Sequence, residues 1–269
     1  MGDAIPGPEG RFPLLVKILD AAENLSVQVH PDEDYAHRHP AAHMKSEAWI
    51  VLRHDDHAEL YRGLDPDLPR HALRAAMESG SILQSLIRVP ARVGDTHWLP
   101  SGICHALGAG ITALEVQTPS DTTFRAWDWD RQDPTRELHY DQAEACTLTG
   151  EAQRLTELAR LSQPRQSPVA GAQRLVETPF FSVDRIDACH ADTIEIGPAR
   201  APRVLWLWSG EWSSAAPTRL PSSATIAVAA CTRPFRLTCQ AAGTVFISTA
   251  ASRSGDSLRS PGFALERAR

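Results

Sequence analysis

Residues 94–105, GDTHWLPSGICH, constrain the fold of this chain most strongly. Gly94 permits a turn, and Pro100 and Gly102 shape a second tight bend. His105 follows that bend at the start of the next extended segment. The pattern therefore predicts strands joined by tight turns, with one imidazole held in a fixed position.

Two other segments place metal-binding side chains on predicted strands. In SVQVHPD, residues 26–32, Gln28 and His30 are two residues apart, so both side chains point to one face of a strand. In MKSEAWIVL, residues 44–52, Glu47 opens an apolar run that is typical of a buried strand. Together with His105, these residues offer an amide oxygen, two imidazoles and a carboxylate. This donor set without thiolate suits Zn²⁺ or another borderline divalent ion.

The spacing of Gly94, Pro100, Gly102 and His105 matches the second cupin motif at every position, so the chain resembles a cupin β-barrel. Six blocks, in their order and wording, are similar to type I phosphomannose isomerases and cover roughly the first half of the chain. These blocks are FPLLVKILDA (12–21), LSVQVHPD (25–32), KSEAW (45–49), LPSGICHALGAG (99–110), LEVQTPSDTTFRAWDWDR (114–131) and RELHYDQA (136–143).

This resemblance implies a mostly β chain with two cupin-type (jelly-roll) β-barrels, the first of which holds one metal ion, Zn²⁺. It implies the interconversion of mannose 6-phosphate and fructose 6-phosphate through a cis-enediol(ate). The expected metal ligands are Gln28, His30, Glu47 and His105. Members of this family usually place a longer segment with a Trp-Gly-Gly motif before the FPLL block. Nothing like it precedes Phe12, which predicts a short form, a gene start placed too late, or a barrel closed by other strands.

Lys45, Glu115, Asp121 and Arg125 are the candidate catalytic residues. Lys45 faces the same way as Glu47 if that segment is extended. From its sequence context Lys45 fits a surface lysine equally well, but the resemblance favours a position in the active site. Glu115 points either into the barrel or outward from a half-exposed strand. Arg125 matches the arginine regarded as catalytic in the family, although composition alone favours a salt bridge. Proton transfer needs a group tuned near neutral pH, and Lys45, Asp121 and Glu115 all remain candidates.

Five further histidines lie near the predicted ligands. None occupies a clear strand face with a second donor, so we expect solvated loop residues and not ligands. These are His37, His39, His43, His54 and His57.

Composition narrows the class of protein. With 269 residues and 42% hydrophobic content, the chain can form one large or two modest domains. A net charge of −6 argues against nucleic acid or an anionic membrane as a partner. No apolar run is long enough for a transmembrane helix, and the N-terminus lacks a secretory signal pattern, so we expect a cytoplasmic protein.

We expect a small sugar phosphate as ligand and a monomer or weak homo-oligomer. Five scattered cysteines without a CxxC motif predict reduced, mostly buried thiols.

The predicted domain organisation follows changes in pattern along the chain. Residues 1–11 are expected to be disordered, 12–145 to form the metal-binding barrel with a helical insertion at 55–80, and 146–171 to form a helix and linker. Residues 172–252 are expected to form a second cupin-like barrel, in which Trp206, Trp208 and Trp212 pack the core and edges, and 253–269 a polar tail.

Two helices are predicted in detail. The first has Asp67 as its N-cap, a buried face of Leu73, Ala76 and Met77, and Gly80 at its end. The second covers 151–161, with Leu155, Leu158 and Leu161 on one face.

Two other functions fit parts of the pattern. A cupin dioxygenase with Fe²⁺ would accept similar ligands, but those sites more often use two histidines and a carboxylate in a short motif. A non-catalytic sugar-phosphate-binding or regulatory protein would bind the ligand or metal without exchanging the substrate's C2 proton.

Overall fold

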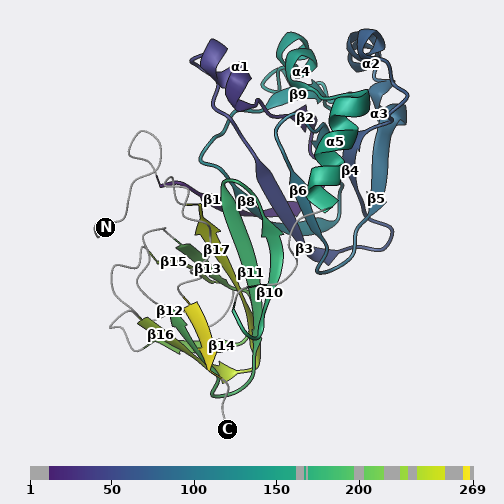
Figure 1. Ribbon diagram of the computed structural model, residues 1–269. Helices are drawn as coiled ribbons and strands as arrows, with labels where there is room; N and C mark the ends of the chain where they lie inside the picture. The colour runs from purple at the N-terminus through teal and green to yellow at the C-terminus, as the bar shows by residue number, and fades with distance from the viewer. Residues whose placement is uncertain are drawn as a thin grey trace. The chain divides into compact units, whose positions relative to one another are not determined.

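The structure is a computed structural model that describes residues 12–161, 167, 169–196, 203–214, 225–229, 235–251 and 263–266 (Figure 1). The chain divides into two compact units, one of Leu15–Ser162 and one of Gln163–Arg269 with Met1–Leu14. Both units consist mainly of antiparallel strands, which confirms the predicted fold class. Among the described residues, no helix is both long and apolar enough to cross a membrane.

The unit Leu15–Ser162 contains two antiparallel sheets. The first, called here the β8 sheet, has the order β1-β8-β3-β6, and the second, called the β2 sheet, has the order β5-β4-β7-β2-β9. The strands of the β8 sheet are β1 (Leu15–Ala21), β8 (Ile111–Gln117), β3 (Glu47–His54) and β6 (Thr96–Leu99). Those of the β2 sheet are β5 (Leu86–Pro90), β4 (Glu59–Leu64), β7 (His105–Ala106), β2 (Val27–Val29) and β9 (Phe124–Trp127).

Two apolar clusters hold this unit together. One joins the facing sides of the two sheets and includes Trp49 on β3 and Leu60 on β4. The other covers the opposite side of the β2 sheet, where Val27 and Val29 pack against helical residues such as Met77. The β2 sheet is therefore apolar on its helix-covered side, which leaves its inner side available for polar residues.

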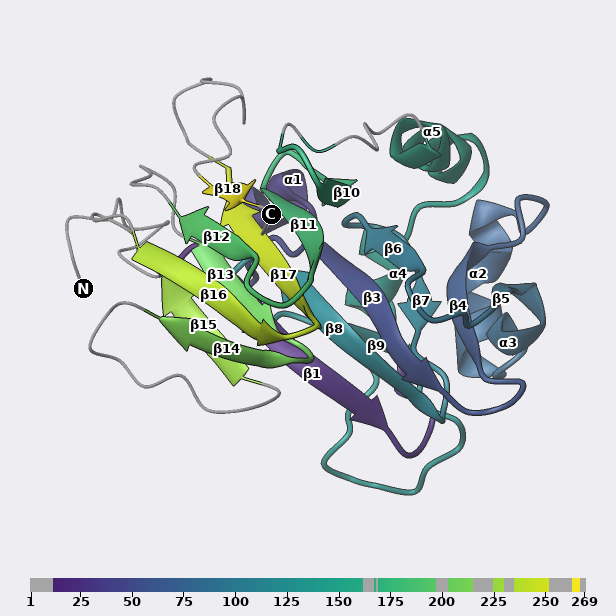
Figure 2. The same cartoon turned by 90° about the horizontal axis from the view of Figure 1, so that it is seen from below.

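Short helices cover the outer side of the β2 sheet. Helices α2 and α3 lie beside β4 and β5 in both views (Figures 1 and 2). The helices of the unit are α1 (Glu33–Arg38), the 3-10 turn η2 (Arg70–Ala72), α2 (Leu73–Glu78), α3 (Ile82–Ser85), α4 (Tyr140–Cys146) and α5 (Gly150–Leu161). Helix α1 forms within the segment predicted as a histidine-rich loop, because Asp32 caps it by accepting a hydrogen bond of 2.7 Å from the Tyr35 N–H.

The predicted helical insertion at 55–80 is partly wrong. Its first part is strand β4, which lies inside the β2 sheet between β5 and β7. The N-cap at Asp67 is also wrong, because the helical turn begins only at Arg70, after Pro69. The predicted buried face of Leu73, Ala76 and Met77 is confirmed, and Gly80 with φ of 74° follows the end of α2.

Helix α5 is confirmed, but the expected leucine face is wrong at Leu155, which is 55% exposed. The side chains of Leu158 and Leu161 lie outside the described residues. Within residues 150–157 of α5, the buried side chain is that of Gln153. Its amide bonds both backbone groups of Leu64: the Leu64 N–H donates at 2.9 Å and the Leu64 carbonyl accepts at 2.6 Å. Gly63, with φ of 83°, lies at the register shift of β4, and the Gln153 amide bonds the backbone directly after it.

The unit Gln163–Arg269 contains two further antiparallel sheets, of order β10-β11-β17-β13-β15 and β14-β16-β12-β18. Trp206 and Trp212 are buried, as expected for packing residues, whereas Trp208 is only half-buried. The strands are β10 (Ala172–Glu177), β11 (Phe181–Ala188), β12 (Thr193–Ile196), β13 (Arg203–Leu207), β14 (Glu211–Ser214), β15 (Thr225–Ala229), β16 (Phe235–Ala241), β17 (Gly243–Ala250) and β18 (Phe263–Glu266).

Strand β18 corrects the prediction of a polar tail from residue 253, since it pairs antiparallel with β12. Residues 1–11 and most of the predicted linker at 162–171 lie outside the described residues. The four cysteines in the described ranges are free thiols: Cys104 and Cys239 are buried, Cys146 is half-buried and Cys189 is exposed. Cys231 lies outside those ranges.

Candidate metal centre

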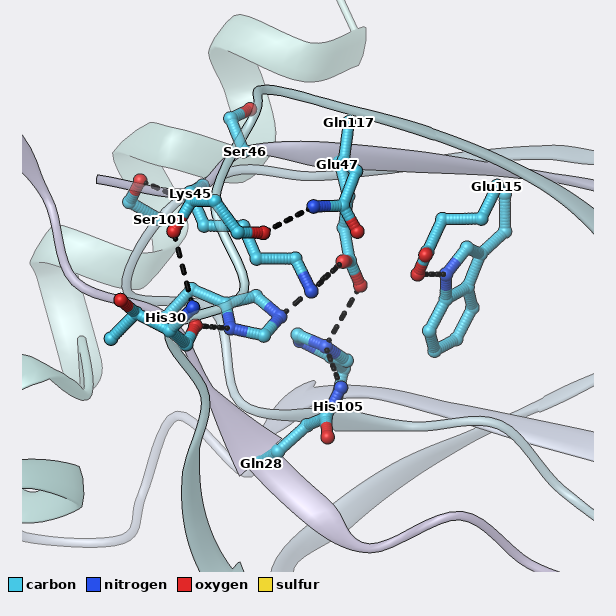
Figure 3. Close-up of polar contacts among 12 residues, drawn as sticks. Gln28, His30, Lys45, Ser46, Glu47, Ser101, His105, Glu115 and Gln117 are labelled. Atoms are coloured by element: carbon cyan, nitrogen blue, oxygen red, sulfur yellow. Dashed lines mark hydrogen bonds and ion pairs between the residues drawn. The ribbon is translucent and has the colours of Figure 1, made fainter. Parts of the chain in front are cut away.

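Three segments that are distant in the sequence converge between the two sheets. His30 follows β2, Glu47 begins β3 and His105 begins β7. One ligand atom from each residue lies within 4.8 Å of the others, and all three residues are buried. Figure 3 shows the three side chains pointing toward one another. The structure thus brings together three of the four predicted ligands as a His–Glu–His cluster.

Local backbone geometry explains this convergence. Gly102 adopts φ of 87°, and its N–H donates to the His30 carbonyl at 3.0 Å, which ties the bend before His105 to the end of β2. Gln28 and His105 are direct partners in the β2–β7 pairing, so their side chains lie on the same face. The bend predicted from sequence therefore aligns two elements of the cluster.

Hydrogen bonds determine which imidazole nitrogen faces Glu47. The His30 Nδ1 lies 3.0 Å from the Thr122 carbonyl, and the His105 Nδ1 lies 2.7 Å from the Ile103 carbonyl. A carbonyl only accepts, so each Nδ1 carries a proton, and the lone pair of the neutral form of each ring is at Nε2. Those Nε2 atoms lie 3.4 Å (His30) and 3.1 Å (His105) from the Glu47 carboxylate. Two lone pairs facing an anion is an arrangement that a cation would stabilise.

The protonation states support the same interpretation. Burial lowers the pKa of His30 to about 4, although Glu47 opposes this shift. Burial by itself would raise the pKa of Glu47, but the Lys45 ammonium, 2.8 Å away, holds it well below its usual range. His30 is therefore neutral and Glu47 ionised at neutral pH, which are the states that bind a metal.

Unsatisfied buried atoms provide a direct test of whether a metal fits. The His30 Nε2 and both carboxylate oxygens of Glu47 are buried without a partner in hydrogen-bond geometry. The Lys45 ammonium approaches Glu47 Oε2 to 2.8 Å and balances part of the charge. Buried polar atoms without partners are costly, so their convergence fits a divalent cation at this site.

Gln28, the fourth predicted ligand, borders the cluster. Its Nε2 lies 3.3 Å from the His105 Nε2, while its Oε1 accepts a hydrogen bond of 3.3 Å from the Ser26 hydroxyl. A half-turn of the amide would present its oxygen to the cluster instead.

Glu115 points inward, which decides between the two orientations that the sequence left open. It is 3% exposed, and its carboxylate accepts hydrogen bonds from the Lys17 ammonium at 2.5 Å and the Trp49 indole at 3.2 Å. Burial and the nearby charge of Glu47 raise the pKa of Glu115, although Lys45 and Lys17 oppose this shift. Lys17 was not among the predicted site residues; its signal was a basic residue flanked by the apolar residues of LVKILDA.

Arg125 lies on β9 directly opposite Gln28, after a bulge that shifts the register of β2 and β9. Its Nε is buried without a hydrogen-bond partner, and its backbone N–H donates to the His139 Nδ1 at 3.2 Å. Asp121 is exposed on the loop between β8 and β9, and it is not one of the residues that converge on Glu47. A catalytic role for Asp121 stays a prediction.

The other histidines near the site lie outside the cluster that the described residues form. The expected loop placement is wrong for His37, which lies on α1, and for His54, which ends β3. His43 is half-buried, and His37, His39, His54 and His57 are exposed.

Comparison with known proteins identifies the relatives of this chain. A family model described as "Phosphomannose isomerase type I, catalytic domain" matches residues 2–61. The mannose-6-phosphate isomerase of Streptococcus mutans is 39% identical over 175 residues, which are 64% of this chain and 54% of that relative. In the matched segments, the chain is similar in sequence to type I phosphomannose isomerases. A Bacillus subtilis protein, "Mannose-6-phosphate isomerase ManA", is 44% identical over 133 residues, 48% of this chain and 42% of that protein.

The chain spans about half the length of these phosphomannose isomerase relatives. The crystal structure of the B. subtilis mannose 6-phosphate isomerase superposes with a TM-score of 0.74 at 26% identity, over 90% of this chain and 76% of that one. A putative mannosephosphate isomerase of Archaeoglobus fulgidus, at 21% identity, has a TM-score of 0.68 over 90% of this chain and 73% of that one, and shares the fold.

Proposed function

We propose that the protein is a metal-dependent aldose–ketose isomerase that interconverts mannose 6-phosphate and fructose 6-phosphate. The observation that carries this proposal is the pair of imidazole lone pairs facing the buried carboxylate of Glu47. We propose Zn²⁺ as the ion and Gln28, His30, Glu47 and His105 as its ligands, since nitrogen and oxygen donors without thiolate suit it. The similarity to mannose-6-phosphate isomerases supports the choice of substrate.

The reaction removes a weakly acidic proton next to a carbonyl and returns it one carbon away through a cis-enediolate. A bound divalent ion would supply Lewis-acid stabilisation of the negative charge that develops on substrate oxygens. The protein's own residues orient the substrate, hold the developing charge and move the proton.

Arg125 is the proposed donor to a substrate oxyanion, because its buried Nε carries an unused N–H on the same sheet face as Gln28. Lys45, Asp121 and Glu115 remain the candidates for proton transfer. Burial raises the pKa of Glu115, the direction that favours a group that both donates and accepts a proton. Lys45 is buried beside Glu47 and lies closer to the cluster than exposed Asp121.

A coupled isomerase assay on purified protein tests the proposal. Removing metal with a chelator should abolish turnover, and adding Zn²⁺ should restore it. His105→Ala should lose both metal and turnover, whereas His54→Ala, which changes an exposed histidine outside the cluster, should lose neither. Full activity in the metal-free protein, or retained metal in His105→Ala, would contradict the proposal.

Anaerobic turnover, ligand binding and proton exchange separate the two alternative functions. Turnover without oxygen argues against a dioxygenase. Binding of mannose 6-phosphate without exchange of its C2 proton with solvent would indicate a non-catalytic binding protein. A cytoplasmic location and a monomeric or weakly oligomeric state stay predictions, which fractionation of cells and size-exclusion chromatography address.

A further inference from the structure

A second arginine lies beside the metal centre on the strand next to His105. In the β4–β7 pairing, Arg62 is the direct partner of His105. Directly opposed residues of antiparallel strands point to the same face, so the Arg62 side chain lies on the inner side of the β2 sheet with that histidine. Its side chain is 8% exposed. Arg62 was not predicted as a site residue, because its segment was expected to belong to a helical insertion.

The inner side of the β2 sheet therefore carries one polar row across four strands. Arg62 on β4 is followed by His105 on β7, Gln28 on β2 and Arg125 on β9. Three strand spacings separate the backbones of the two arginines, a distance of about 14 Å. The register therefore places one arginine on each side of the metal ligands His105 and Gln28.

Helix α5 supplies one ionic partner of Arg62. Gln153 anchors this helix to the Leu64 backbone, and Glu157, one helical turn later, forms an ion pair with the Arg62 guanidinium. A carboxylate and a phosphate present oxygens to the guanidinium fork in similar ways. Glu157 remains 27% exposed, so it can rotate outward while Gln153 keeps the helix in place.

We propose that Arg62 binds the phosphate group of the substrate, and that Glu157 is its counter-ion only while the site holds no phosphate. This inference rests on the proposed sugar-phosphate isomerase function. The two arginines then have different roles: Arg125 donates to the oxyanion at the reacting carbons, and Arg62 binds the phosphate at the other end of the substrate. This arrangement also makes the site selective for anionic sugars, because a neutral sugar cannot displace Glu157.

The variant R62M/E157M tests this inference, because it removes both charges of this ion pair together. Calorimetric titration with inorganic phosphate is the deciding measurement. The wild type should bind phosphate, and the double variant should bind it at least about tenfold more weakly, the change expected for one charge-assisted hydrogen bond. The KM for mannose 6-phosphate should rise by a similar factor with a much smaller change in kcat, and metal content should stay the same. E157Q should bind inorganic phosphate more tightly than the wild type, since the competing carboxylate is gone.

The matched control is R154M/E151M, which removes an exposed ion pair from the same helix and should change neither phosphate binding nor KM. Equal phosphate binding by wild type and R62M/E157M would overturn the inference and leave the pair as an anchor of α5. No phosphate binding by the wild type, or weaker binding by E157Q, would overturn it as well. If the wild type lacked isomerase activity, the proposed function would fail, but the titration would still decide the role of Arg62.

Discussion

Replacing Glu47 by glutamine tests the electrostatics of the metal centre with almost no change in volume. The carboxylate is fully buried, lies within 3.4 Å of two imidazole nitrogens, and is 2.8 Å from the Lys45 ammonium. It is the only anionic member of the His–Glu–His cluster. Because loss of a residue that merely supports a ligand costs about 10- to 100-fold in metal affinity, we expect Glu47→Gln to weaken Zn²⁺ binding by more than about 100-fold.

The same change should destabilise the metal-free protein. Removing one partner of a buried ion pair costs about 3–5 kcal/mol, and a new amide hydrogen bond to an imidazole would return about 1 kcal/mol. The net loss of roughly 2–4 kcal/mol corresponds to a decrease in Tm of about 5–15 °C for a domain of this size. Metal content by mass spectrometry, a competition titration with a chelator and calorimetric unfolding measure these quantities.

The double variant K45M/E47Q is the control, since it removes both charges and should recover most of the lost stability while still failing to bind metal. A Zn²⁺ affinity of Glu47→Gln within about tenfold of wild type would refute the assignment of Glu47 as a ligand. An unchanged Tm of the metal-free variant would refute the ion-pair argument.

Three other perturbations probe the surroundings of the centre. Gly102→Ala should lower the free energy of unfolding in urea by about 2–5 kcal/mol, because φ is 87° and the new Cβ would lie 2.6 Å from Leu148 Cγ. The control Gly150→Ala, at φ of 54° with open space around it, should lower it by only about 1–2 kcal/mol. Equal losses would contradict the packing argument. Arg125→Ala should keep its metal while turnover falls by about 100-fold, and a normal rate would exclude Arg125 from the reaction. Burial and the charge of Arg125 lower the pKa of His139, whose Nδ1 accepts the Arg125 N–H. A folded pKa below the unfolded value near 6.5 gives stability that is fully present above that pH and is lost as pH falls. The stability advantage of wild type over His139→Asn should therefore shrink between pH 7.5 and 5.5, and a constant difference in urea midpoint would contradict this.

The candidate metal site was largely predictable because short-range backbone rules position its parts. The glycines and proline before His105 specify a bend that only a few backbone conformations satisfy, and the spacing of Gln28 and His30 follows from strand alternation. The helix at 150–161 was predictable for the same reason, since its sequence favours helix locally. Its buried contact was not, because Gln153 packs against a strand end some 90 residues earlier in the chain.

What the sequence alone determined was the set of donors and the turns and strands that carry them, since these depend on neighbouring residues. The tertiary structure decided the direction of Glu115, the placement of Lys17 against it, and the pairing that puts Arg62 beside His105. It also decided the tautomers of both imidazoles, through carbonyls of Thr122 and Ile103. Strand register and burial set all of these, and both depend on contacts between segments that local propensity does not encode.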